Sequence, residues 1–352
     1  MNPLSPKERC LKVLNGELPD RIPVIPQSFM FSLEEAGYQM KDVVKNPSAM
    51  AKSHVICQEK YGYDGCVIDF DDATLAEACG AKVIYRDDEP AVVDESDVVL
   101  KDLRDVEQLE LPDPNSGRIP VWLETTKLLV DAIGDNVFVM GRADQGPFTL
   151  ACLLRGTSQF MMDIVTEDKE LIHKVIDYCR QACVIFAKAQ KDAGAHITSI
   201  GDALAGPNLI SPDMFREFAL QPEIALTKEV QDYGIPYSIH ICGNTTDIIS
   251  DMASTKADVL EIDYQIDIGM ARKRVDDNIV LMGNVNPSDP LVFGTPEEVK
   301  EASRLVIEKC KGRGLILSSG CAMGRKTPTA NLKAMINAAD QYGRYEQIME
   351  MK

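Results

Sequence analysis

Positive charge, long apolar runs and compact cysteine spacing are scarce or missing in this 352-residue sequence. Lysine and arginine number 37 against 55 aspartate and glutamate residues, so the formal net charge is −18. This acidic excess argues against nucleic acid and anionic membranes as main partners, because both attract positively charged surfaces. No run approaches the ~20 apolar residues that span a bilayer, and the N-terminal segment lacks the apolar stretch of a signal peptide. We therefore expect a cytoplasmic protein.

The ten cysteines are spread from residue 10 to residue 321 without the spacing of a disulfide framework. In a long chain without a secretory signature, this spread predicts reduced thiols, most of them packed as small core residues. Repeats, low-complexity tracts and flexible linkers are missing too, so nothing divides the chain into separate units.

The sequence does contain a regular alternation of short apolar runs with helical patterns. Eight β-branched or apolar runs end at polar or glycine-containing turns: residues 21–26, 65–70, 136–143, 196–203, 236–243, 257–263, 278–285 and 314–321. Helical patterns separate most of them, as in residues 166–194, where we predict Thr166 as the N-cap and Gly194 as the stop. This alternation predicts an α/β protein whose residues 1–352 form a single (β/α)8 TIM barrel domain.

Two segments lie outside this alternation. The first 20 residues contain PKERCLKVLNG, which predicts an N-terminal helical extension packed before the first strand. The stretch from about 71 to 120, after the second strand, is longer than a crossover requires and contains AVVDESDVVLKDL. We interpret this stretch as a small insertion that carries a hairpin, and not as a second domain.

A possible metal site lies at the ends of two predicted strands. His240 and Cys242 are two residues apart in a β-like run, so their side chains point to the same face. Cys321 ends another such run and could supply a third ligand. Three nitrogen and sulfur ligands without an obvious fourth are typical of an open, catalytic zinc site. The alternative is a hydrogen-bonded His240 beside two cysteines that serve only as packing residues.

Polar residues also gather at the predicted C-terminal strand ends, where barrel enzymes place their active sites. They include Asp202, Glu261, Asn284 and Arg142, and Arg142 can be neutralised by the nearby Asp144. A zinc ion held by two thiolates and one imidazole keeps little positive charge, so it activates water only modestly. It can still bind a substrate thiol and lower its pKa, which favours methyl transfer to a thiol over hydrolysis.

Several motifs resemble the uroporphyrinogen decarboxylase superfamily over nearly the whole chain. They are ELPDRIPVIP, YGYDGCVIDFD, GPFTLACLLRG, HICGN, GNVNP and SSGCAMGRKTPTANLKAMINAA. The H-x-C…C set resembles the zinc-dependent corrinoid methyltransferase branch, which includes methylcobamide:coenzyme M methyltransferases. The resemblance implies a (β/α)8 barrel, a role in one-carbon metabolism, and His240, Cys242 and Cys321 as the zinc ligands.

The resemblance also implies the partners of the reaction. The methyl donor would be a methylcorrinoid (cobalamin) on a separate corrinoid protein, because the D-x-H-x-x-G signature of a corrinoid-binding module is missing here. The acceptor would be a small molecule, a thiol such as coenzyme M or another acceptor such as tetrahydrofolate. Members of the family are often monomers or homodimers.

Four further residues receive expected roles, and the first three also have a structural alternative. Asp202 would orient the thiol or contact the corrinoid, or else bond a neighbouring loop. Glu261 would be a carboxylate at the fourth zinc position, or else one half of a charge pair. Asn284 would bind a polar end of a substrate or cofactor, or else cap a turn. Arg325 would reach an anionic tail of the substrate or cofactor.

Three other functions stay open from the sequence. The chain could demethylate a substrate and methylate a corrinoid protein, with zinc as a Lewis acid. It could be a non-enzymatic corrinoid-handling or structural zinc protein. It could also be a metal-independent decarboxylase, but true decarboxylases of the superfamily carry an Arg-rich M-R-Q-A-G-R segment after the first strand. The corresponding stretch here, RIPVIPQSFMFSLEEAG, has Arg21 before the strand and no arginine after it, and a porphyrinogen with eight carboxylates needs dense basic pairing.

Overall fold

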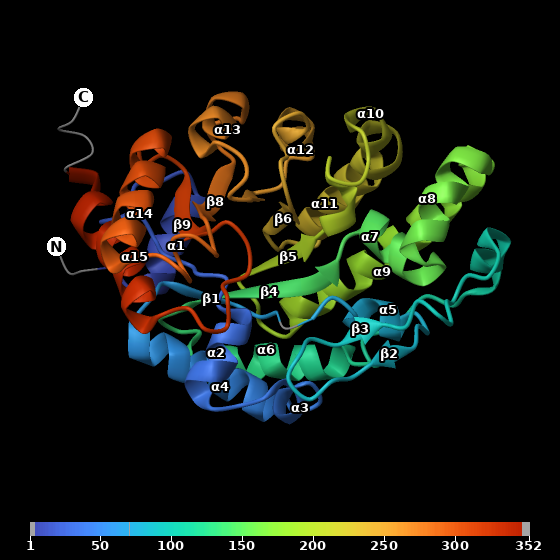
Figure 1. Cartoon of the computed structure of the whole chain (residues 1–352), viewed down its shortest axis with the longest axis horizontal. Coiled ribbons are helices and arrows are strands. Elements are labelled where there is room, and N and C mark those ends of the chain that lie inside the picture. Colours follow the sequence, from blue (N-terminus) through green and yellow to red (C-terminus); the bar gives the residue numbers. More distant parts are fainter. Residues whose placement is uncertain (1–3, 70, 347–352) are drawn as a thin grey trace.

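A seven-stranded parallel sheet is the centre of the molecule in the computed structural model, which describes residues 4–69 and 71–346 (Figure 1). Its strands are β1 (Gly65–Val67), β4 (Phe138–Gln145), β5 (Ile197–Gly201), β6 (Tyr237–Ile241), β7 (Val259–Ile262), β8 (Val280–Val285) and β9 (Leu315–Ser319), paired in that order. Every residue of these strands is buried, as expected of a curled sheet with side chains on one face and helices on the other. The expected TIM-like α/β fold is confirmed.

The first expected strand, residues 21–26, forms single bridges instead of a continuous strand. Val24 pairs in parallel with Leu317 of β9, and its carbonyl accepts the Asp64 N–H at 2.8 Å, directly before β1. The segment therefore occupies the eighth barrel position, between β9 and β1. Pro23 and Pro26 have no N–H groups to donate, so a full ladder cannot form here. In the second expected strand, residue 70 lies outside the described residues.

Helices cover the outside of the curled sheet, and Figure 1 shows α12, α13 and α14 next to one another beyond β6 and β8. The helices that follow or precede the strands are α4 (Pro47–Tyr61), α6 (Ile119–Ile133), α7 (Pro147–Arg155), α8 (Thr157–Thr166), α9 (Lys169–Asp192), α10 (Pro212–Met214), α11 (Leu220–Asp232), α12 (Ile249–Ser254), α13 (Ile268–Arg274), α14 (Pro296–Cys310) and α15 (Thr329–Tyr342). A 3-10 turn spans Ala203–Ala205, and a π-helical turn spans Phe215–Ala219. None of the helices in the described part of the chain has the length and apolar character needed to cross a bilayer.

The N-cap predicted at Thr166 was wrong. Thr166 ends α8, where its hydroxyl donates to the Met162 carbonyl at 2.9 Å. The side chain of Asp168 caps α9 instead by accepting the Glu170 N–H at 2.8 Å. Threonine and aspartate are both favourable N-cap residues. Because α8 extends through Thr166 and α9 begins only at Lys169, Asp168 occupies the N-cap position of α9.

The N-terminal extension is confirmed as helix α1 (Pro6–Leu14), which begins with a capping box formed by Ser5 and Glu8. Its Cys10 and Val13 pack against side chains that fill the barrel, among them Met140 and Val259. The helix therefore covers the N-terminal end of the barrel, opposite to the strand ends where the polar residues lie.

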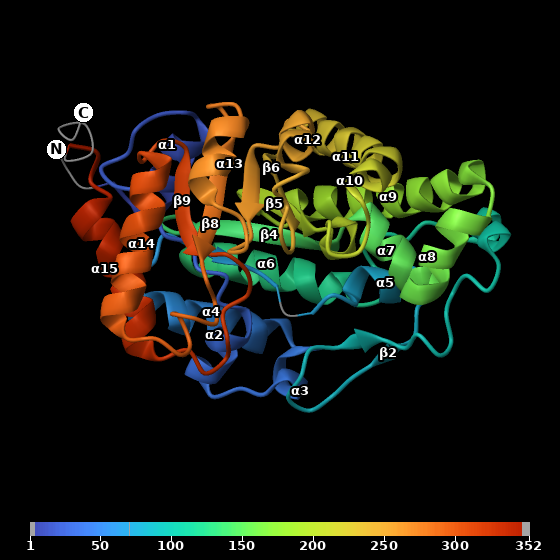
Figure 2. The same cartoon turned by 45° about the horizontal axis from the view of Figure 1, so that its top comes forward.

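The expected hairpin is present in the insertion as β2 (Val83–Ile84) and β3 (Val92–Val93), which pair antiparallel. The same region contains α5 (Thr74–Ala78) and a 3-10 helix over Leu103–Gln108. Figure 2 shows β2 away from the barrel strands, on the side where α3 (Met40–Val43) lies. The Lys41 N–H donates to the Asp87 carbonyl at 3.0 Å, so the hairpin is attached to the segment that follows α2 (Phe29–Ala36).

Candidate metal centre

The three predicted zinc ligands meet at the C-terminal ends of β6 and β9. His240 lies in β6, Cys242 follows that strand, and Cys321 lies two residues after the end of β9. One ligand atom from each residue lies within 4.8 Å of the other two. Donor atoms bound at about 2.0–2.3 Å around a tetrahedral zinc ion lie roughly 3.5 Å apart. The cluster is therefore close to a zinc-binding geometry without the ion.

A backbone carbonyl orients the imidazole of His240. Its Nδ1 lies 3.2 Å from the carbonyl oxygen of Glu261 on β7, and its Nε2 lies 3.2 Å from Cys242 Sγ. A proton on Nδ1 satisfies the carbonyl and leaves the Nε2 lone pair directed at the two sulfurs. Metal-binding histidines are commonly held in this way by a partner on the opposite ring nitrogen.

The two thiols of the cluster differ in their pKa values. In the metal-free protein, hydrogen bonds from the Cys242 thiol and then from the Nε2–H of a doubly protonated His240, whose pKa is itself raised, lower the pKa of Cys321. The same hydrogen bond to Cys321, followed by burial, raises the pKa of Cys242. The cluster thus favours a thiolate at Cys321 even without a metal. The other eight cysteines are buried, whereas Cys242 and Cys321 are partly exposed.

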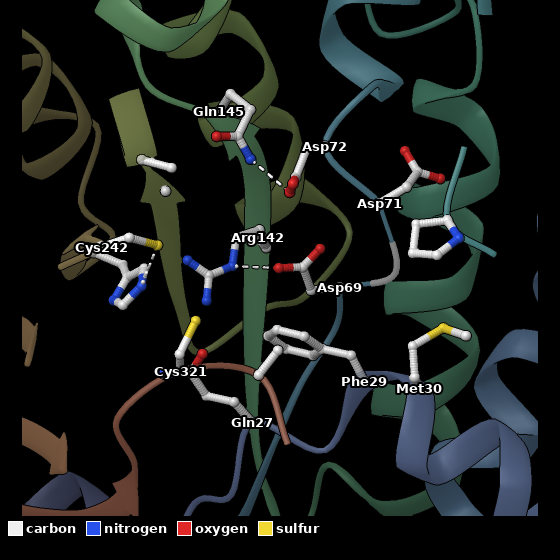
Figure 3. A pocket seen from close by; sticks show the side chains of 15 residues that line it. Gln27, Phe29, Met30, Asp69, Asp71, Asp72, Arg142, Gln145, Cys242 and Cys321 are labelled. Atoms are coloured by element: carbon white, nitrogen blue, oxygen red, sulfur yellow. Dashed lines mark hydrogen bonds and ion pairs between the residues drawn. The ribbon is translucent and has the colours of Figure 1, made fainter. Parts of the chain in front are cut away.

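A cavity of about 200 Å³ opens over the candidate metal centre formed by His240, Cys242 and Cys321 (Figure 3). Its wall contains the three candidate ligands, Arg142, the carboxylates Asp69, Asp71 and Asp72, and Gln27, Phe29, Met30 and Gln145. Figure 3 shows Arg142 between the two cysteines on one side and Asp69 on the other. A small molecule that enters the cavity would meet sulfur ligands, one guanidinium group and several carboxylates.

Arg142 is held by two carboxylates that the sequence did not assign to it. Its Nη2 lies 3.0 Å from Glu261 Oε2, and its Nε lies 3.1 Å from Asp69 Oδ2. The expected pairing with Asp144 was wrong, because the Asp144 carboxylate accepts the backbone N–H of Leu75 at 2.6 Å. The positive charge at the base of the cavity is therefore already neutralised.

A family model described as Uroporphyrinogen decarboxylase (URO-D) matches residues 5–342. This chain belongs to the URO-D family. The methylcobamide:CoM methyltransferase MtbA of Methanosarcina acetivorans is 30% identical over 97% of this chain and 99% of that protein. MtaA of Methanosarcina barkeri, also a methylcobamide:CoM methyltransferase, is 28% identical over the same shares. A solved structure of a methyltransferase from Methanosarcina mazei gives a TM-score of 0.88 at 28% identity and covers 96% of this chain and 99% of that one.

Glu261 of this URO-D family protein lies behind the metal centre. Its Oε1 accepts the Ser238 hydroxyl at 2.8 Å, and its Oε2 faces Arg142. The side chain is fully buried, and neither it nor Asp202 belongs to the described wall of the cavity. The charge-pair alternative for Glu261 matches this geometry, and its contact with the centre is the backbone carbonyl that holds His240.

Asp202 lies under the N-terminus of α7. Its carboxylate accepts the Thr149 N–H at 2.7 Å and the Phe148 N–H at 3.4 Å. A Cβ atom on Gly146 would lie 2.5 Å from the Asp202 side chain, so the strand end and the helix approach closely here. Burial raises the pKa of Asp202. These contacts match the structural alternative considered for Asp202.

Asn284 and Arg325 also make contacts within the protein. The Asn284 amide donates to the carbonyls of Asp263 at 3.0 Å and Ile266 at 2.8 Å, and thereby caps the loop after β7. Arg325 lies 2.7 Å from Glu34 and also pairs with Asp88. It joins the loop after β9 to α2 and the insertion, and its charge is compensated there.

Gln145 and Asp72 also line the cavity, although the sequence did not indicate them as parts of the site. Gln145 is the last residue of β4, which continues two residues beyond the strand we expected. Asp72 lies two residues after the second expected strand, residues 65–70. Their positions beside strand ends were the available signal, but only the tertiary structure places them in one wall and joins Gln145 Nε2 to Asp72 Oδ1 at 2.8 Å.

Proposed function

We propose that this URO-D family protein is a zinc-dependent methyltransferase that moves a methyl group between a protein-bound methylcorrinoid and a small thiol. The observation that carries the proposal is the cluster of His240, Cys242 and Cys321 within 4.8 Å at the base of an open cavity. The similarity to methylcobamide:CoM methyltransferases over nearly the full length supports it.

The donor set suits zinc in type, number and orientation. One imidazole and two thiolates are common zinc ligands, and three protein ligands leave one position for a substrate. When bound, zinc would supply a site that lowers the pKa of a substrate thiol. The protein itself holds His240 Nε2 toward the two sulfurs through the Glu261 carbonyl and favours a thiolate at Cys321.

The size of the cavity determines which substrate can enter it and which substrate stays at its opening. A volume of about 200 Å³ suits a thiol of a few heavy atoms and is below the usual range for sites that enclose large ligands. A corrinoid would therefore approach the opening while held by its own protein. A porphyrinogen is also too large for this volume, and its carboxylates would face Asp69, Asp71 and Asp72.

Metal analysis and a methylcobalamin assay together test the proposal. We expect one zinc ion per wild-type chain and a thiol-dependent loss of the methyl–cobalt absorbance. Cys321→Ala removes a proposed ligand, so both the zinc and the activity should be lost. Cys310→Ala is the matched control, because Cys310 is a buried cysteine at the end of α14 and lies outside the cluster.

Two results would count against the proposal. Retention of one zinc ion by Cys321→Ala would refute the site. Zinc-loaded wild-type protein that leaves methylcobalamin intact with every thiol tested would refute the thiol as acceptor. Methylation of cob(I)alamin from a methylated substrate would then support the reverse direction of transfer.

A further inference from the structure

The cavity wall contains a buried acceptor without a partner. Gln145 is 4% exposed, and its Oε1 has no hydrogen-bond partner among the described residues. Its Nε2 donates to Asp72 Oδ1 at 2.8 Å. In Figure 3 the amide oxygen of Gln145 points away from Asp72, toward the side of the cavity where Cys242 lies. An unpaired buried amide oxygen is costly, so a ligand that donates to it gains binding energy.

The hydrogen bond to Asp72 determines which atom of the Gln145 amide lacks a hydrogen-bond partner among the described residues. An ionised carboxylate only accepts hydrogen bonds, so the amide must present its nitrogen to Asp72. The flipped amide would place its oxygen against the carboxylate, and the two acceptors would repel each other. The free atom at this position is therefore an acceptor.

The charges of the wall favour a positively charged ligand group. Asp71 is paired with Arg118 at 2.6 Å, and Asp69 is paired with Arg142 at 3.1 Å. Asp72 forms no salt bridge in the described part of the chain, lines the cavity, and is an exposed residue. Negative charge is thus uncompensated at the place where the unpaired amide oxygen lies.

Asp72 remains an acceptor near neutral pH. The surrounding walls desolvate it and, together with the neighbouring Asp71, raise its pKa to about 6. Since the side chain is open to water on one side, water weakens this desolvation, and we take the carboxylate as ionised above pH 7. A bound cation would lower the pKa further, because an opposite charge favours the ionised form.

We propose that the thiol used in the methyl transfer proposed above carries a protonated amine, and that Asp72 and Gln145 receive this amine. The inference rests on the proposed function, and it names the class of substrate as an aminothiol. An anionic tail, such as the sulfonate of coenzyme M, would face uncompensated carboxylate charge and an amide oxygen. Arg142 does not offset this, because both Asp69 and Glu261 already neutralise it.

Three thiols with the same two-carbon chain test the proposal on the full-length, zinc-loaded protein. They are cysteamine, 2-mercaptoethanol and coenzyme M, whose tails are positive, neutral and negative. We measure kcat/KM for the loss of the methyl–cobalt bond of methylcobalamin at pH 7.5. A charged hydrogen bond to Asp72 should favour cysteamine over coenzyme M by at least about tenfold.

Variants separate recognition of the tail from the intrinsic reactivity of each thiol. Asp72→Asn should reduce the ratio of kcat/KM for cysteamine to that for coenzyme M by about tenfold, and Asp72→Lys should reverse the preference. Asp97→Asn is the matched control, because Asp97 is an aspartate of the same insertion that pairs with Lys82 outside the cavity. This control should leave the ratio unchanged.

Calorimetric binding of the same three thiols gives a readout that is independent of methyl transfer. Tighter binding of cysteamine than of coenzyme M supports the inference. A preference of the wild type for coenzyme M, or a ratio that Asp72→Asn and Asp72→Lys leave unchanged, overturns it. Absence of turnover with all three thiols refutes the proposed function, and the order of binding still decides the inference.

Discussion

Replacing Glu261 by glutamine distinguishes a carboxylate that binds zinc from one that stabilises Arg142. The substitution keeps the size of the side chain and the backbone carbonyl that accepts from His240 Nδ1. It removes the negative charge that lies 3.0 Å from Arg142 Nη2. If the ion pair is the role of Glu261, the protein should lose stability and keep its zinc.

The loss of stability can be worked from the geometry. Two unit charges 3.0 Å apart interact by about 5 kcal/mol at an effective dielectric constant of about 20. The glutamine variant has no carboxylate charge to desolvate, so the loss of the ion pair is partly offset. Arg142, however, remains buried without this partner. Breaking a buried pair on one side costs roughly 3–5 kcal/mol, and Asp69 still contacts Arg142 at 3.1 Å. We therefore expect about 3 kcal/mol and a fall in Tm of about 5 °C.

Scanning calorimetry measures the change in Tm, and metal analysis measures zinc per chain in the same preparation. We expect Glu261→Gln to melt earlier and to retain one zinc ion. Asp163→Asn is the matched control, since it breaks another buried ion pair, 2.6 Å from Arg155, away from the cavity. Loss of zinc from Glu261→Gln with an unchanged metal-free Tm would refute the reasoning and identify Glu261 as a fourth ligand.

Three further predictions concern other parts of the molecule. In metal-free protein at pH 6, iodoacetamide should modify Cys321 before the other cysteines, because the pKa of its thiol is lowered. Bound zinc should block this reaction, and mass spectrometry of the peptides measures both effects. Burial, followed by the charge of Asp202, raises the pKa of Glu223, so the folded protein retains a proton that the unfolded chain has lost above about pH 4.5. The stability of the folded protein should therefore fall as the pH rises from about 4.5 through the raised pKa of Glu223. Glu223→Gln should flatten the plot of Tm against pH and should melt at a higher temperature than the wild type at pH 9. The control Glu124→Gln, at an exposed residue, should change neither the plot nor the Tm at pH 9. Arg325→Met should change KM for coenzyme M less than twofold, because two carboxylates already neutralise this arginine; a tenfold rise in steady-state kinetics would show that it binds the substrate.

The sequence determined seven of the eight expected strands, the order of the elements and the candidate metal ligands. Strands and helices follow from the local spacing of apolar residues, which needs no knowledge of contacts. The shared face of His240 and Cys242 follows from the pleat of a single strand. Cys321 could be predicted as the third candidate ligand because parallel strands in a barrel bring their C-terminal ends to one rim. The bridged segment 21–26 departs from the expectation at its two prolines, where backbone donors are missing.

Only the tertiary structure decided which charges pair and which side chains face the cavity. Arg142 pairs with Glu261, 119 residues further along the chain, and not with Asp144, which lies two residues away. The register of β4, β5, β6 and β7 places Arg142 and Glu261 together, while the backbone turn at Asp144 directs its carboxylate to α5. Gln145 and Asp72 likewise meet only across the sheet. The ligand types are local properties of the sequence, whereas the electrostatics of the cavity depend on distances that only the assembled barrel defines.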